Sequence, residues 1–284
     1  MEILNKKKTL NCGGKIVDFS DPKVMGILNV TPDSFYDGGR YITNDAIERR
    51  VEEIVSSGAD FIDVGAASSR PGAKLIPPDE ELERLEPALD IIRKRHPESI
   101  VSVDTYNSEV ARNVAENYGV EIINDISSGT IDGRMFETIA SIGVVYVIMH
   151  MQGRPENMHL NPVYDDVTND VIHFFSEKTA GLKKLGVCDV IIDPGFGFGK
   201  SPEHNYRLVK DLDVFNFFDL PVLTGFSRKS MVYKLLGLPP EDALAGTIAF
   251  NTIALIKGAD ILRVHDVKEA VETVSVYKAM RGEE

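Results

Sequence analysis

The 284-residue chain has only two cysteines, no tryptophan and fewer basic than acidic residues. Cys12 and Cys188 lie far apart and match no metal-binding spacing, so we expect reduced thiols in a cytoplasmic protein. No apolar stretch approaches the roughly 20 residues of a membrane span, and no apolar segment follows the basic run 6–8 as it would in a signal peptide. The net charge of −13 disfavours nucleic acid as a partner, and an anionic small substrate would need a local cationic pocket.

A pattern of amphipathic helix, glycine, acidic residue and short apolar strand recurs along the chain. The glycine of the pattern is Gly58, Gly119, Gly186 or Gly258 in its four copies. Each glycine suits the left-handed position that ends a helix. Each strand is a nearly unbroken apolar run, which is typical of parallel strands covered on both faces.

Eight strands alternating with helices favour a (β/α)₈ TIM barrel. The predicted strands are at about 24–29, 60–64, 100–104, 121–124, 144–149, 189–193, 220–224 and 260–264. The alternative, an open doubly wound sheet, would carry GxGxxG after its first strand, and that motif is absent there. Residues 8–19 predict a β-hairpin that turns at Gly13-Gly14. We therefore expect one domain over 1–284, with the hairpin at 8–19 and the barrel at 23–281.

Polar residues stand where the predicted strands end, which in a TIM barrel is the working face. The set is Asn29, Asp63, Asp104, Asn124, Met149-His150, Asp193, Thr224-Gly225, Arg263 and His265. Asp and Asn also serve as plain strand stoppers and helix caps, and for any single residue that interpretation is as good. For the whole set, a concave polar site is the better interpretation.

Three loops at this face carry further chemistry. Arg70, in the loop 65–73, suits a phosphate or diphosphate because guanidinium binds phosphate in a fork. The segment 193–200, DPGFGFGK, ends like a nucleotide-binding P-loop, but Pro194 stands where the first glycine is required, so flat-ligand binding beside Asp193 is favoured. Lys229, in 225–230, stands at a predicted helix start that favours anions or carbonyl oxygens, although a solvated charge cluster is as common there.

Seven segments together resemble the dihydropteroate synthase family, in its usual order and over residues 24–266. They are ILNVTPDSFYDGG, SSRPGA, SVDTY, INDIS, DPGFGFGK, GFSRKS and RVHD. The resemblance implies a TIM barrel, usually a homodimer, that serves folate biosynthesis and is a sulfonamide target. It also implies a transferase that condenses 6-hydroxymethyl-7,8-dihydropterin diphosphate with 4-aminobenzoate and releases diphosphate with the help of Mg²⁺.

The resemblance also implies roles for individual residues. The catalytic group would be Asp104, Arg70 and Lys229. The pterin would contact Asp104, Asn124, Met149, Asp193, Gly225, Lys229 and Arg263. Diphosphate would lie on Asn29, Arg70, Arg263 and His265, with Asn29 also reaching the Mg²⁺. Aminobenzoate would meet Phe35, Ser69, Arg70, Pro71, Phe198, Lys229 and Ser230.

One loop departs from the family pattern. Where the family commonly has Gly-Gly-Glu-Ser-Thr-Arg-Pro-Gly, this chain has Ala67 in place of the glutamate and Ser69 in place of the threonine. The change bears on aminobenzoate and sulfonamide handling. It is the one feature that supports a rival interpretation, a paralogue that binds pterin without turnover. A second rival, a pterin-binding methyltransferase module, would have no use for diphosphate contacts.

Overall fold

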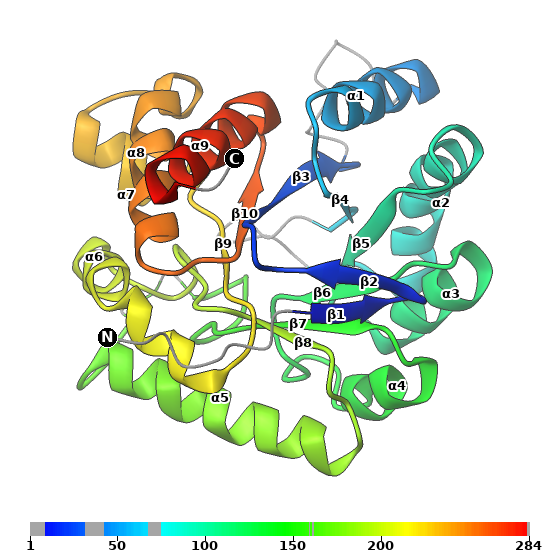
Figure 1. The fold of residues 1–284 in the computed structure, drawn as a ribbon. Coiled ribbons are helices and arrows are strands. Elements are labelled where there is room, and N and C mark those ends of the chain that lie inside the picture. Colours follow the sequence, from blue (N-terminus) through cyan, green and yellow to red (C-terminus); the bar gives the residue numbers. More distant parts are fainter. Residues whose placement is uncertain (1–8, 32–42, 68–74, 159, 161, 283–284) are drawn as a thin grey trace.

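A barrel of eight parallel strands forms the centre of the protein in this computed structural model, which describes residues 9–31, 43–67, 75–158, 160 and 162–282 (Figure 1). The strands are β3 (Lys23–Asn29), β4 (Phe61–Gly65), β5 (Ile100–Asp104), β6 (Ile122–Asp125), β7 (Val145–Met149), β8 (Val190–Asp193), β9 (Leu223–Thr224) and β10 (Ile261–Val264). They pair in the order β8-β7-β6-β5-β4-β3-β10-β9. A parallel bridge between Ile192 and Val222 joins the two outer strands, so the TIM-barrel prediction is confirmed.

Helices follow the strands and cover the outside of the barrel (Figure 1). They are α1 (Asn44–Ser56), α2 (Pro78–Arg95), α3 (Ser108–Tyr118), α4 (Met135–Ile142), α5 (Val167–Lys184), α6 (Pro202–Lys210), α7 (Ser230–Leu236), α8 (Leu244–Ile256) and α9 (Val267–Arg281), with short 3₁₀ turns η1 (Leu212–Phe218) and η2 (Pro240–Asp242). The four glycines of the repeat all have positive φ, as predicted: Gly58, Gly119, Gly186 and Gly258. Among the described helices, none has the length and apolar character to cross a membrane.

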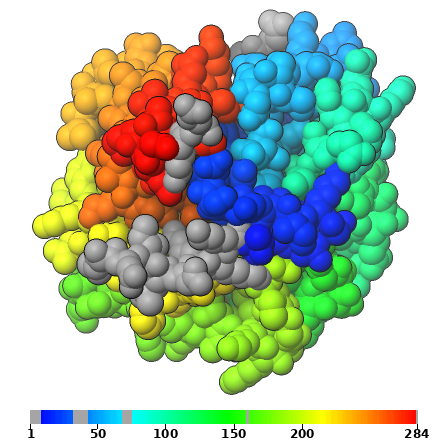
Figure 2. Space-filling model, in the orientation of Figure 1, coloured from blue at the N-terminus to red at the C-terminus, as the bar shows by residue number. Residues whose placement is uncertain are grey.

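The predicted hairpin closes the N-terminal end of the barrel, which we call the base. Strands β1 (Thr9–Cys12) and β2 (Lys15–Asp18) pair antiparallel, and Gly13 and Gly14 take the two positive φ angles that the tight turn needs. Leu10, Cys12, Val17 and Phe19 from the hairpin segment pack on Phe61 and other apolar side chains inside the strands. Figure 2 shows the hairpin in dark blue near the middle of this face.

The acidic residue of the repeat has a specific structural role at the base. The Asp60 carboxylate accepts the backbone N–H of Val24 at 2.8 Å, Glu121 accepts that of Val101 at 2.9 Å, and Asp260 accepts that of Val222 at 2.8 Å. In each case the acid directly precedes one strand and accepts an N–H at, or just before, the start of the neighbouring strand. These bonds satisfy strand-end N–H groups that would otherwise be buried without a partner.

The seventh strand is shorter than the sequence predicts. Residues 220–224 were expected to be extended, but only Leu223–Thr224 pair as β9. Pro221 has no N–H to donate, and the N–H of Val222 is taken by the Asp260 carboxylate. The Pro221 carbonyl still accepts the Ile192 N–H at 3.0 Å, which keeps the barrel closed at this point.

Candidate active site

A buried ion-pair cluster lies at the C-terminal end of the barrel, which we call the mouth. The Arg263 guanidinium donates to Asp63 at 2.6 Å through Nε and to Asp104 at 2.9 Å through a terminal nitrogen. Asp63 is fully buried, and the Asp104 side chain is 14% exposed. Strands β4, β5 and β10 thus bring together residues from distant parts of the sequence around one cation.

The Asp63 carboxylate also sets the orientation of Asn124. It accepts the Ser102 hydroxyl at 2.5 Å and the Asn124 Nδ2 at 3.3 Å. Because the NH₂ of Asn124 is directed at Asp63, its carbonyl oxygen is left as the acceptor for a ligand. The sequence placed Asp63 at a strand end but assigned it no role.

Within this cluster, the pKa of Asp104 is raised to near neutral pH. Burial raises the pKa of Asp104 to about 7, while Arg263 acts to lower it. The carboxylates of Asp63, Asp125 and Asp193 add to the rise because like charges disfavour ionisation. Asp104 can therefore change its charge near neutral pH, a property common among functional groups.

Asp193 and Lys229 form the second charged group of the mouth. Burial raises the pKa of Asp193 and lowers that of Lys229 to about 8, and the opposite charge of each partner works against both shifts. Asp193 accepts the Gly195 N–H at 2.7 Å. The Lys229 ammonium donates to the Phe196 carbonyl at 2.6 Å and lies 4.8 Å from the centre of the Phe198 ring. A cation, a carboxylate and an aromatic face are thus available at one place.

Lys200 ends the same loop, and its ammonium bonds the protein backbone. Its ammonium donates to the carbonyls of His150 at 3.0 Å, Gly195 at 2.9 Å and Phe198 at 3.0 Å. An ammonium has three N–H groups, so all of them are committed to backbone. A P-loop lysine must reach a phosphate instead, and the structure therefore speaks against the nucleotide-binding alternative.

Three of the residues assigned to diphosphate, Asn29, Arg263 and His265, lie at or just beyond the ends of β3 and β10. Asn29 is half-buried, and a Cβ placed on Gly65 would lie 3.5 Å from both Asn29 Oδ1 and Asp104 Cβ. His265 follows β10, and its backbone N–H donates to the Ser227 hydroxyl at 3.2 Å. Burial and the nearby charge of Arg263 lower the pKa of His265 to about 4, so its ring is neutral at pH 7.

The donor set suits a hard divalent cation only in part. Among the described residues, no group of three or more His, Cys, Asp or Glu side chains is placed to hold a metal. Asn29 Oδ1, near the Asp104 carboxylate, offers oxygen ligands of the kind Mg²⁺ takes, and Mg²⁺ usually keeps several waters beside substrate phosphates. The residues therefore fit an Mg²⁺ that a diphosphate ligand completes.

Several predicted site residues lie outside the described part of the chain: Phe35, Ser69, Arg70 and Pro71. Of the remainder, Met149 packs with Tyr106 and Ile126 in a small apolar group at the mouth, against which Phe198 also packs. A Cβ added to Gly225 would lie 3.7 Å from the Lys229 Nζ. Ser230 is exposed at the first position of α7.

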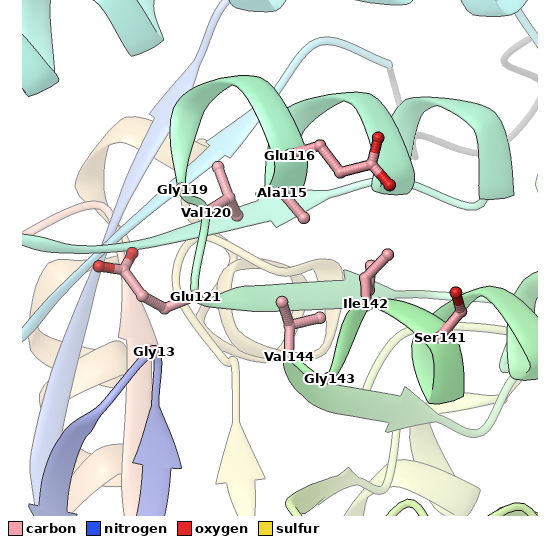
Figure 3. A pocket seen from close by; sticks show the side chains of 10 residues that line it. All are labelled: Gly13, Ala115, Glu116, Gly119, Val120, Glu121, Ser141, Ile142, Gly143 and Val144. Atoms are coloured by element: carbon pink, nitrogen blue, oxygen red, sulfur yellow. The ribbon is translucent and has the colours of Figure 1, made fainter.

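The cavity in Figure 3 lies at the other end of the barrel and does not involve this cluster. Gly13 of the hairpin, the last turns of α3 and α4, and the residues just before β6 and β7 line it, and Glu116 and Glu121 are among its side chains. None of its described lining residues is basic. It is therefore unsuited to an anionic substrate, and the mouth is the candidate site.

Comparisons with known proteins agree on one family. The model of the family described as "Pterin binding enzyme" matches residues 25–265. The dihydropteroate synthase of Escherichia coli (strain K12) is 45% identical over 268 residues, which are 94% of each chain. This chain belongs to the dihydropteroate synthases.

Solved structures of this family share the fold closely. The Yersinia pestis dihydropteroate synthase in a sulfonamide drug complex superposes with a TM-score of 0.91 at 42% identity, covering 96% of this chain and 99% of that one. The Xanthomonas albilineans enzyme with 4-aminobenzoic acid gives 0.90 at 37% identity, covering 98% and 99%. The Xanthomonas enzyme has also been solved with 7,8-dihydropteroate.

Ala67, the described part of the departure from the family's usual loop, lies at the mouth. Its methyl packs against the apolar group formed by Tyr106, Ile126 and Met149. An apolar contact thus occupies the position where the family commonly carries a carboxylate. The charged cluster of Asp63, Asp104 and Arg263 is complete without that carboxylate.

Proposed function

We propose that this chain joins 6-hydroxymethyl-7,8-dihydropterin diphosphate to 4-aminobenzoate, giving 7,8-dihydropteroate and diphosphate for folate biosynthesis. The observation that carries the proposal is the buried set of Asp104, Asn124 and Asp193 facing Arg263 and Lys229 at one end of the barrel. A pterin ring offers amidine-like donors and a carbonyl, which these groups would match. An unmet polar group in such a site would cost roughly 1–3 kcal/mol.

The pterin would be held by complementary partners on several strands. Asp193 and the Asn124 carbonyl oxygen would accept ring N–H groups, and Lys229 would donate to the ring carbonyl. Arg263, fixed by Asp63, would lie against the ring face. Met149 and Gly225 would supply contact surface, since glycine allows the close approach of a flat ligand.

The reaction would proceed by departure of diphosphate from the exocyclic carbon. Asn29, Arg70, Arg263 and His265 would stabilise the leaving anion, with His265 acting as a neutral donor. The carboxylate of Asp104 would stabilise the positive charge that the ring then shares with that carbon. An Mg²⁺ held by Asn29 and diphosphate would neutralise part of the leaving-group charge.

The aminobenzoate would enter a site formed by Phe35, Ser69, Arg70, Pro71, Phe198, Lys229 and Ser230. Its carboxylate would meet Ser230 and the start of α7. The neutral arylamine nitrogen would form a bond to the exocyclic carbon after the C–O bond to diphosphate has broken. The nitrogen would then release one proton to diphosphate or water, so the reaction would require no dedicated general base.

A homodimer in the cytoplasm is also part of the proposal. Neighbouring helices α7, α8 and α9 leave large apolar side chains exposed, and a second copy of the chain would cover such a surface. They include Leu235 (61% exposed), Ile256 (59%), Val276 (70%) and Met280 (65%). Light scattering of the purified chain and of Ile256→Lys would test this, and a monomeric wild type would contradict it.

The decisive assay mixes the purified protein with dihydropterin diphosphate, Mg²⁺ and 4-aminobenzoate, and follows both products. Equal amounts of diphosphate and dihydropteroate, lost when aminobenzoate or metal is omitted, would support the synthase. Tight pterin binding without diphosphate release would favour the non-catalytic paralogue and direct attention to Ala67 and Ser69. Methyl transfer to a corrinoid would favour the other rival.

A further inference from the structure

Lys200 is a buried lysine to which the proposed reaction assigns no task. It is 9% exposed, and its ammonium bonds three backbone carbonyls from two different loops. His150 follows β7, whereas Gly195 and Phe198 belong to the loop after β8. Because all three N–H groups are used, the side chain has none left for a substrate.

The loop after β8 packs so closely on its neighbour that its carbonyls need an internal donor. Gly195 and Gly199 have φ angles of 71° and 58°, and added Cβ atoms would lie 2.0 Å from the His150 oxygen and 2.4 Å from the Gln152 oxygen. At that distance no water fits between the two segments. The Lys200 ammonium supplies the donors that buried carbonyls require.

The same loop provides the surroundings of Lys229. Phe196, between two of the glycines, offers the carbonyl that accepts the Lys229 ammonium at 2.6 Å. The Phe198 ring lies 4.8 Å from that ammonium, and the Phe198 carbonyl is itself held by Lys200. No hydrogen bond joins Lys200 to Lys229, although the two ammonium charges repel each other. Lys200 instead holds the carbonyls of Gly195 and Phe198, which stand on either side of the Phe196 carbonyl in the chain.

We propose that Lys200 is a positioning residue for Lys229, acting by holding the Phe196 carbonyl and the Phe198 ring in place. The inference rests on the proposed function, in which Lys229 donates to the pterin carbonyl. Loosening the loop would let the Lys229 ammonium leave the ring carbonyl, so pterin affinity would fall. A positioning role therefore predicts that the effect of Lys200 on pterin affinity requires Lys229, whereas a general stabilising role does not.

The test is a double-mutant cycle on pterin binding. Calorimetry would measure the Kd of 6-hydroxymethyl-7,8-dihydropterin diphosphate with Mg²⁺, without aminobenzoate, for wild type, Lys200→Met, Lys229→Met and the double variant. We expect Lys200→Met to raise the Kd about tenfold, the effect of losing about one hydrogen bond to a charged group. In the Lys229→Met background it should raise the Kd by less than about twofold, since the two changes act through one contact.

Lys178→Met is the matched control. Lys178 is also partly buried and donates to a loop carbonyl, that of Ser128 at 2.9 Å, but it bonds neither the segment 195–200 nor Lys229. We expect its Kd to stay within about twofold of wild type. If Lys200→Met does not fold, Lys200→Gln takes its place under the same criteria.

Three results would overturn the inference: an unchanged Kd in Lys200→Met, an equal loss in both backgrounds, or an equal loss in Lys178→Met. A wild-type protein that binds no pterin would instead overturn the proposed function. The two failures are therefore distinguishable.

Discussion

The two ends of the barrel use the same residue types for opposite purposes. At the base, the carboxylates of Asp60, Glu121 and Asp260 accept peptide N–H groups of neighbouring strands. At the mouth, Asp63 and Asp104 face the Arg263 guanidinium. Asp60 and Asp63 are only three residues apart, so the position along one strand decides what a carboxylate does.

The difference lies in what surrounds each carboxylate. The base is closed by the apolar face of a hairpin, and each of its three acids bonds a fixed backbone donor. Asp60 and Glu121 also pair with Lys23 and Arg93. At the mouth, oppositely charged side chains pair with one another, and their remaining hydrogen-bonding positions are available to a ligand. Stability is therefore expected to depend on packing at the base and on charge balance at the mouth.

The largest effect is expected from Arg263→Met, which removes the cation between two buried carboxylates. An uncompensated buried charge costs about 3–5 kcal/mol, so urea unfolding should show a loss of that order together with loss of turnover. Adding Asp63→Asn should recover part of the stability. Arg228→Met, in the more exposed pair with Asp266, should cost less than about 1 kcal/mol. Equal losses of unfolding free energy in Arg263→Met and Arg228→Met would contradict the special importance of the buried ion-pair cluster.

Leu10→Ala should damage the base without touching the chemistry. Leu10 is 1% exposed beneath the barrel, and such a truncation costs about 2–5 kcal/mol of unfolding free energy. Kinetic constants of the folded enzyme should stay within about twofold of wild type, because ligand and hairpin lie at opposite ends. Ile16→Ala on the same hairpin, 68% exposed, should change stability by less than about 0.5 kcal/mol. A changed pterin KM in Leu10→Ala would show that the two ends are coupled.

Arg70→Ala tests the role proposed for Arg70 in the release of diphosphate. Loss of a donor to the leaving group should lower kcat on the order of 10²-fold while pterin binding is mostly kept. Steady-state rates and calorimetry on the same preparation would measure both quantities. Full turnover by the variant would remove Arg70 from the proposed mechanism.

The smallest expected effect is a shift in pH dependence. Asp104 should act as a carboxylate, so kcat/KM should rise with pH through its pKa of about 7, and it should fall as Lys229 loses its proton near pH 8. Asp63→Asn removes a like charge beside Asp104, which should move the acid limb down by about one pH unit. An acid limb that stays in place would mean that Asp104 does not set it.

The ionisation of Asp104 should also affect the free energy of unfolding, but stability should fall with rising pH where activity rises. Because the folded state raises the pKa of Asp104 above its ordinary value of 3.8, the native protein binds more protons than the unfolded chain up to about pH 7. The contribution of Asp104 to stability therefore falls as the pH rises through this window. Thermal unfolding of wild type and Asp104→Asn across the window measures it, and parallel curves would contradict it.

Much of the fold could be predicted from local patterns. Gly13-Gly14 predicts its turn because few other residues accept two positive φ angles, and the repeated glycines predict helix ends for the same reason. Unbroken apolar runs predict buried parallel strands. The predicted strand 220–224 was too long: only residues 223–224 form β9, because Pro221 has no N–H and the Asp260 carboxylate takes the N–H of Val222, which joins the barrel through an isolated bridge to Ile192.

The sequence by itself determined which residues are buried, where strands end and which polar groups stand at those ends, because these depend on a residue and its near neighbours. Only the tertiary structure decided the partners: Asp63 meets Arg263 across 200 residues, and Lys200 bonds His150 across 50. Ionic and hydrogen-bond partners are chosen by distance in space, and barrel closure is what brings these groups within reach.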